Sequence, residues 1–136
     1  MQAATLETVW LASAPDAIIF ADGAGVIRVW NQGAAALFGH RAAEAIGHTL
    51  ALIVPAPYRP AHGAGFSRAV QQGHCATDAV VLTSHALTKD GRRIAVELSA
   101  AIIWSPAGQG RGILAIGRAV TARRAHEQAQ QERLAR

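Results

Sequence analysis

The chain has 136 residues, a length typical of one compact domain, and a formal net charge of +4. Hydrophobic residues make up 51% of it, yet no apolar run reaches the roughly 20 residues of a membrane-spanning helix. The first residues have neither the basic nor the apolar region of a secretion signal, which predicts a cytoplasmic protein. The single cysteine, Cys75, excludes an internal disulfide and a zinc site built on paired cysteines.

The positive charge is concentrated partly at the end of the chain, where no DNA-binding motif and no aromatic–basic interleaving accompanies it. A solvated, arginine-rich helix is the simpler interpretation, and it predicts neither a nucleic-acid partner nor a membrane. The residues concerned are Arg118, Arg123, Arg124, Arg133 and Arg136.

The first third of the chain predicts a short helix and then a hairpin. Leu6 to Ala12 has apolar residues at helical spacing, and Pro15 ends that helix. Two apolar strands follow, Ala17–Ala21 and Val26–Trp30, joined by a glycine-containing turn. We therefore expect an N-terminal helical cap over residues 1–14 and a core that begins at residue 15.

The middle of the chain predicts short helices. Asn31 suits the N-cap of a helix over Gly33–Phe38, and Ala42–Ile46 and Leu50–Val54 are further short elements. A longer helix follows, with Pro60 in its first turn and Gly73 at its end. Its internal glycines, Gly63 and Gly65, each weaken it by roughly 1 kcal/mol relative to alanine. We expect this helix to depend on tertiary contacts or on a ligand.

The second half predicts three strands and a terminal helix. The turn Lys89-Asp90-Gly91 joins a strand containing Val80 to Ala86 to one in which the even positions from Ile94 to Ile102 point inward. Gly112–Val120 is the last strand, and residues 122–136 form a charged linker helix. The whole pattern predicts an α+β fold with short helices on one face of an antiparallel sheet. In its five-stranded version, with order 2-1-5-4-3, sheet and helices enclose a ligand pocket.

From about Leu6 to Thr121 the chain resembles the PAS family. The matching stretches are Pro15-Asp16-Ala17-Ile18, the turn from Asp22 to Gly25, Trp30-Asn31-Gln32-Gly33-Ala34-Ala35, Leu37-Phe38-Gly39, Ile46-Gly47, Lys89-Asp90-Gly91 and Gly117-Arg118-Ala119-Val120-Thr121. One departure is Ala119, where the family commonly has an aspartate. The resemblance implies a PAS core over residues 15–121 that works in signal transduction as a sensor, not as an enzyme.

Within the family, Pro55-Ala56-Pro57-Tyr58-Arg59-Pro60-Ala61-His62 resembles the haem-binding PAS domains of FixL-type oxygen-sensor kinases and direct oxygen sensor phosphodiesterases. That resemblance implies haem b as the cofactor and His62 as its proximal iron ligand. It also implies that Arg68, six residues later, contacts a haem propionate.

Helical spacing supports an inward orientation of His62. Phe66 lies four residues after it and Ala69 and Val70 lie seven and eight after it, so one face of the helix carries all four. A neutral imidazole is a common haem ligand, and an apolar pocket suits a porphyrin. For a lone histidine, a ring bonded to backbone or solvent is the simpler interpretation. The motif around His62 favours haem.

The resemblance also implies the composition of the distal side. The relatives have a gas-contacting arginine where this chain has Leu82, and the phosphodiesterases have a methionine where it has Val80. Strand parity adds Val96, Leu98 and Ala100 to this apolar lining. Because such a pocket offers no hydrogen-bond donor, we expect carbon monoxide and nitric oxide to bind readily and dioxygen to be held less well.

A second function remains open: a PAS module that binds another apolar molecule, such as a fatty acid, or a ligand-free dimerisation domain. An enzyme is not expected, because no catalytic triad, metal-ligand pair or phosphate-binding loop is present. The resemblance implies a homodimer and a kinase, cyclase or other output domain, in the same chain or in another. On this interpretation the chain is an excised sensor or a stand-alone PAS protein.

Overall fold

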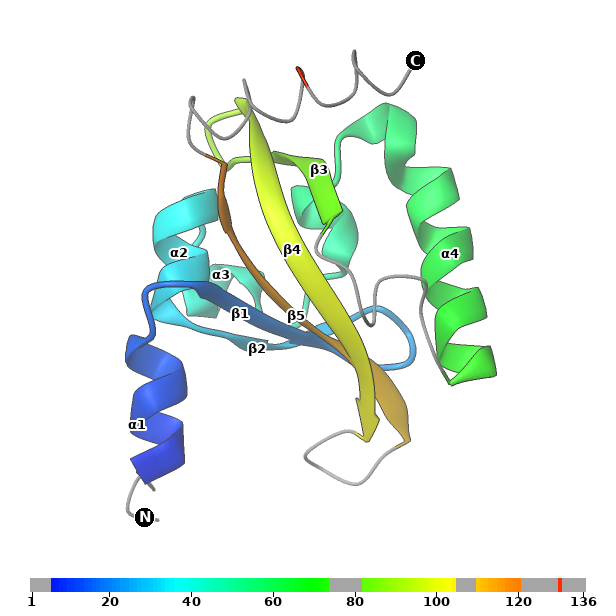
Figure 1. The fold of residues 1–136 in the computed structure, drawn as a ribbon, viewed down its shortest axis with the longest axis horizontal. Coiled ribbons are helices and arrows are strands. Elements are labelled where there is room, and N and C mark those ends of the chain that lie inside the picture. The colour runs from blue at the N-terminus through cyan, green and yellow to red at the C-terminus, as the bar shows by residue number, and fades with distance from the viewer. Residues whose placement is uncertain (1–5, 74–81, 105–109, 121–129, 131–136) are drawn as a thin grey trace.

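Five strands form one antiparallel sheet in the order β2-β1-β5-β4-β3, in a computed structural model that describes residues 6–73, 82–104, 110–120 and 130 (Figure 1). The strands are β1 (Ala17–Ala21), β2 (Ile27–Trp30), β3 (Leu82–Leu87), β4 (Arg93–Trp104) and β5 (Arg111–Ala119). This order confirms the predicted fold. The terminal helix expected over residues 122–136 lies outside the described residues, except for Gln130, and so does Val80.

Helical segments fill the connection between the two hairpins. They are α2 (Gln32–Phe38), α3 (Ala42–Ala45), the 3-10 turns η1 (Leu50–Ile53) and η2 (Ala56–Tyr58), and α4 (Arg59–Gln72), while α1 (Leu6–Ser13) precedes the sheet. In Figure 1, α1 and α4 stand on opposite sides of the sheet. Within the described residues, every helix is too short or too polar to span a lipid bilayer.

The core lies where α2 and α3 cover the β1–β2 end of the sheet. Ile27 is fully buried, and Trp30 and Phe38 are each 5% exposed, with ring centroids 5.5 Å apart. The indole Nε1–H of Trp30 donates to the backbone carbonyl of His40 at 2.9 Å, so burial of this ring leaves no unsatisfied donor. These contacts hold the helices against the strands that carry the pocket.

Asn31 is the N-cap of α2, as the sequence predicts, and it is buried. Its Oδ1 accepts hydrogen bonds from the amides of Ile18 at 2.8 Å and Ala34 at 2.9 Å. Its Nδ2 donates to the carbonyls of Leu11 and Asp16, both at 2.9 Å, and lies 3.3 Å from the carbonyl of Ala14. One side chain therefore joins the end of α1, the start of β1 and the first turn of α2.

Helix α4 has little contact with the rest of the domain. Among its 14 residues only Ala69 is buried. It ends where predicted, at Gly73, whose φ of 80° is left-handed and whose amide donates to the carbonyl of Ala69. A Cβ built at Gly63 or Gly65 meets no atom within 4 Å, so close packing within the protein does not require either glycine. The helix therefore stands off the sheet and leaves space beneath it.

Candidate functional site

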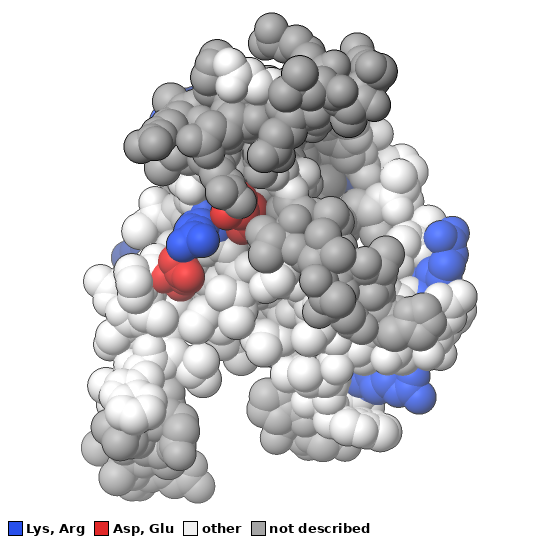
Figure 2. All heavy atoms as spheres, viewed as in Figure 1, with Lys and Arg blue, Asp and Glu red and all other residues white. Residues whose placement is uncertain are grey.

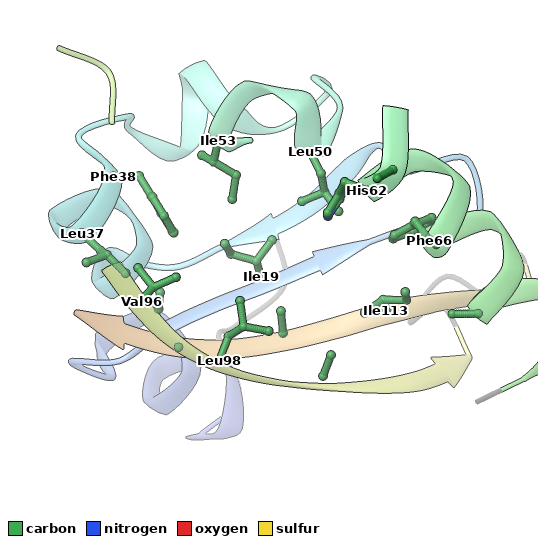
Figure 3. A pocket seen from close by; sticks show the side chains of 17 residues that line it. Ile19, Leu37, Phe38, Leu50, Ile53, His62, Phe66, Val96, Leu98 and Ile113 are labelled. Carbon is green, nitrogen blue, oxygen red and sulfur yellow. The ribbon is translucent and has the colours of Figure 1, made fainter. Parts of the chain in front are cut away.

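An apolar pocket of about 350 Å³ lies between the sheet and the helices η1 and α4 (Figure 3). That volume is at the lower end of the range usual for small-molecule sites. Leu50 and Ile53 of η1 line one side, and His62 and Phe66 of α4 line another, facing the strands. The position of α4 away from the sheet creates this space.

The floor of the pocket comes from three neighbouring strands and is built from small residues. In the sheet register Ala17 pairs with Gly117 and Gly117 with Leu98, while Ile19 pairs with Ala115 and Ala115 with Ala100. Side chains directly opposite each other point to the same face of a sheet, so these rows lie side by side beneath the helices. The small side chains at four of these six positions leave a broad, flat floor.

His62 is the only residue with a polar side chain among the described residues that line this pocket. Its imidazole lies beside Phe66, with ring centroids 6.5 Å apart, and the residue is exposed to solvent on its outer side. Desolvation by the apolar surroundings lowers the pKa of His62 below its usual 6.5. The ring is therefore neutral at physiological pH, with a nitrogen lone pair available to a metal.

The structure brings most, but not all, of the predicted site residues together. His62, Phe66, Val96, Leu98 and Ala100 all line the pocket. Arg68 is exposed on α4 and does not line this pocket or the hollows beside it. Leu82 pairs with Leu98 in the β3–β4 ladder, but the described part of the structure does not include the side chain of Leu82. Val80 lies wholly outside the described residues.

Several lining residues were not predicted from the sequence. They come from β1, from β5 and from the helices that precede α4: Ala17, Ile19, Leu37, Phe38, Leu50, Ile53, Ile113, Ala115 and Gly117. The alternation of β5 was a usable signal, since its inward positions are odd-numbered. The predicted strand order already places β5 between β1 and β4, but the register of these pairs depends on long-range contacts that strand periodicity does not reveal.

Two further hollows adjoin the pocket, and His62 lines both. One, of about 180 Å³, is more polar and is lined by Thr49, Arg59 and Ser67 as well as by apolar residues. The other, of about 560 Å³, opens between α4 and β3. His62 thus stands where three spaces meet, and a ligand larger than the apolar pocket alone can extend past it.

A five-stranded antiparallel sheet with helices over one face and an apolar pocket between them is the architecture of a class of sensory and regulatory domains. A family profile described as "PAS fold" matches residues 11–125. The chain belongs to the PAS family, whose members serve as sensory or regulatory domains in signalling and commonly work with output domains.

Among curated proteins, the chain is 41% identical over 54 residues to the sensor protein FixL of Bradyrhizobium diazoefficiens, covering 40% of this chain and 11% of FixL. It is 36% identical over 85 residues to an uncharacterised protein of Azorhizobium caulinodans, covering 62% of this chain and 12% of that protein. The chain therefore spans only about a tenth of the length of either relative.

Solved structures share the fold. The PAS domain of a protein from Colwellia psychrerythraea superimposes with a TM-score of 0.67 at 26% identity, covering 85% of this chain and 94% of that one. An RNA-binding Light-Oxygen-Voltage receptor gives a TM-score of 0.75 at 23% identity, covering 96% of this chain and 36% of that one. The second likeness, at this identity, concerns the fold alone.

Proposed function

We propose that this domain senses a gas or a redox change through haem b bound by His62. The observation that carries the proposal is the position of His62, a neutral imidazole alone among apolar side chains at the pocket described above. The partial identity to FixL, a sensor protein, supports the same interpretation. Residues 15–121 would form the sensor core, with residues 1–14 as a cap and 122–136 as the link to an output domain.

The residues present fit a flat, largely apolar macrocycle. Ala100, Ala115 and Gly117 have small side chains or none, so the sheet leaves room for a flat ring system. On the helix side, the space next to Gly65 is empty of protein atoms and can hold part of the ligand. When bound, haem would supply an iron that takes carbon monoxide, nitric oxide or dioxygen as a ligand.

The chain's own groups have separable roles in this proposal. His62 would hold the iron through a ring nitrogen, and Phe66 would pack beside the ring and limit its rotation. Val96 and Leu98 would exclude water from the opposite wall and offer no hydrogen-bond donor. We therefore expect carbon monoxide and nitric oxide to be favoured over dioxygen.

The test is a titration of the purified protein with haemin, followed by absorbance in the Soret region, in the ferric state and in the reduced state with carbon monoxide. For the wild type, the Soret absorbance is expected to rise with added haemin and to saturate at one haemin per protein chain. His62→Gly is expected to lose the histidine-ligated spectrum and to regain it when imidazole is added. His48→Ala is the matched control, since His48 is exposed and lines none of the three spaces. An identical spectrum in His62→Gly without imidazole would contradict the proposal.

The strongly aliphatic lining also favours a second candidate, an apolar ligand without a metal, such as a fatty acid. Leu37, Ile53 and Ile113 would pack against its chain. In that case a fluorescent fatty acid is displaced by unlabelled fatty acid, and His62→Gly leaves the affinity unchanged.

A homodimer is a further proposal: Val9, Trp10 and Leu11 of α1 are 47%, 63% and 47% exposed. Sedimentation of the wild type and of Trp10→Ser tests whether α1 forms that contact.

A further inference from the structure

The polar hollow of about 180 Å³ next to the apolar pocket makes the two ends of the site chemically different. It shares Leu50, His62 and Phe66 with the pocket and is otherwise lined by residues that include Thr49, Arg59 and Ser67. A ligand whose apolar body occupies the pocket would therefore place a neighbouring group in surroundings that contain hydroxyls and a guanidinium. An amphipathic ligand fits this arrangement better than a wholly apolar one.

Arg59 lines the wall of this hollow from an exposed position on α4. It lies three residues before His62 at the start of α4, so the two side chains share one face of the helix. Its Nε donates to the carbonyl of Val54 at 3.0 Å. That bond orients the guanidinium and leaves its Nη groups as donors. Among the described residues, no carboxylate lies within ion-pair distance of Arg59.

The charge on this side of the molecule matches an anion. Helix α4 contains Arg59 and Arg68 and no acidic residue. On the face shown in Figure 2, basic side chains stand on both sides of the molecule, and the described acidic side chains visible there lie only away from the side where α4 runs in Figure 1. Arg68 lines neither the pocket nor the polar hollow, although it carries the same charge.

We propose that Arg59, and not Arg68, binds the carboxylate of the ligand that occupies the pocket. The inference rests on the proposed function of the pocket and adds the class of ligand: a molecule with a large apolar body and a carboxylate near His62. A porphyrin with propionate side chains and a long-chain fatty acid share this chemistry. Ser67 adds a hydroxyl donor at the same wall. A charge-assisted bond from a guanidinium to a carboxylate provides the specificity.

The experiment compares carboxylate and ester forms of two probes. The first pair is metal-free protoporphyrin IX and its dimethyl ester, and the second is palmitic acid and its methyl ester. Affinities are measured by quenching of tryptophan fluorescence or by displacement of a fluorescent fatty acid. Metal-free porphyrin makes no iron bond, so its result is independent of whether His62 binds iron.

The wild type is expected to bind the carboxylate more tightly than the ester. In Arg59→Gln the ratio of the two affinities is expected to fall roughly tenfold. Arg92→Ala is the charge-matched control: its guanidinium pairs with Asp90 in the β3–β4 turn, which lies outside both spaces. High salt should weaken carboxylate binding in the wild type and have less effect in Arg59→Gln. Circular dichroism confirms that each variant is folded.

The outcomes separate the two proposals. Equal preferences in the wild type and in Arg59→Gln, or a preference lost in Arg68→Ala instead, would overturn the role of Arg59. So would a failure of both carboxylate probes to bind. If palmitate alone shows an Arg59-dependent preference, and haemin gives no histidine-ligated spectrum, the carboxylate role stands and the haem proposal fails. If the porphyrin shows it, and His62→Gly changes only the haem spectrum, both proposals stand.

Discussion

Replacement of Asn31 by alanine tests how α1, β1 and α2 are joined. The side chain makes four hydrogen bonds of 2.8–2.9 Å, to the amides of Ile18 and Ala34 and to the carbonyls of Leu11 and Asp16. At about 1 kcal/mol net for each bond, less what water recovers at the exposed carbonyls, Asn31→Ala should cost about 3–4 kcal/mol. For a domain of this size that lowers Tm by about 10–20 °C.

The assay is urea unfolding followed by tryptophan fluorescence, with Trp30 as a buried reporter next to Asn31 in the sequence. Asn31→Ser supplies a hydroxyl oxygen that can accept from the amide of Ala34, so it should recover about 1 kcal/mol of the loss. Gln32→Ala, at the neighbouring exposed position, should change stability by less than about 0.5 kcal/mol. If Asn31→Ala falls within about 1 kcal/mol of the wild type, the reasoning is refuted, because the bonds would then contribute little.

Three further predictions concern α4 and the charged contacts. Gly65→Ala should raise the free energy of unfolding of the ligand-free protein by about 0.5–1 kcal/mol, because alanine stabilises the helix and its Cβ meets no neighbour. The same Cβ lies at the pocket and should weaken porphyrin binding. Unchanged values in both assays would contradict this prediction. Because the pKa of His62 is lowered in the folded state, the unfolded chain binds more protons, so the free energy of unfolding should fall as pH decreases from 6.5 towards that lowered pKa. His62→Phe should reduce this fall. The same dependence of the free energy of unfolding on pH in both proteins, measured by urea unfolding, would argue against the prediction. A hydrogen bond from Lys89 and one from the backbone of Arg41 lower the pKa of Glu44 to about 2. The stability that these bonds to the Glu44 carboxylate contribute is complete above pH 4.5 and is lost as pH falls towards 2. In Lys89→Met, NMR titration should find the pKa of Glu44 raised towards 4.5, and a value still near 2 would exclude Lys89 as the main cause.

Much of the fold was predictable because its signals are local. Asn31 caps a helix, Gly39 and Gly73 end helices with left-handed backbones, and the turn at Gly91 joins two alternating strands. Small differences remain at the ends of elements: Val26 forms only an isolated bridge with Thr49 and is not part of β2. Fraying and tertiary contacts decide such terminal residues.

The candidate site was only partly predictable. Helical spacing placed His62 and Phe66 on one face, and strand alternation placed Val96 and Leu98 on another, and the structure has all four around the pocket. The family resemblance pointed to Arg68 for an anionic group, whereas the structure has Arg59 at the polar hollow. Which of two arginines reaches a hollow depends on how the helix is rotated and on what lies behind it.

The sequence by itself determined the succession of elements and the histidine on the apolar face of α4, because caps, turns and periodicity act over a few residues. The order of the strands was predicted as well, but only the tertiary structure decided which residues of those strands lie beneath that histidine. The register that sets Ile19, Ala115 and Ala100 side by side joins residues far apart in the chain, through hydrogen bonds that no local pattern specifies. The tertiary structure likewise holds α4 away from the sheet, and that separation creates the pocket.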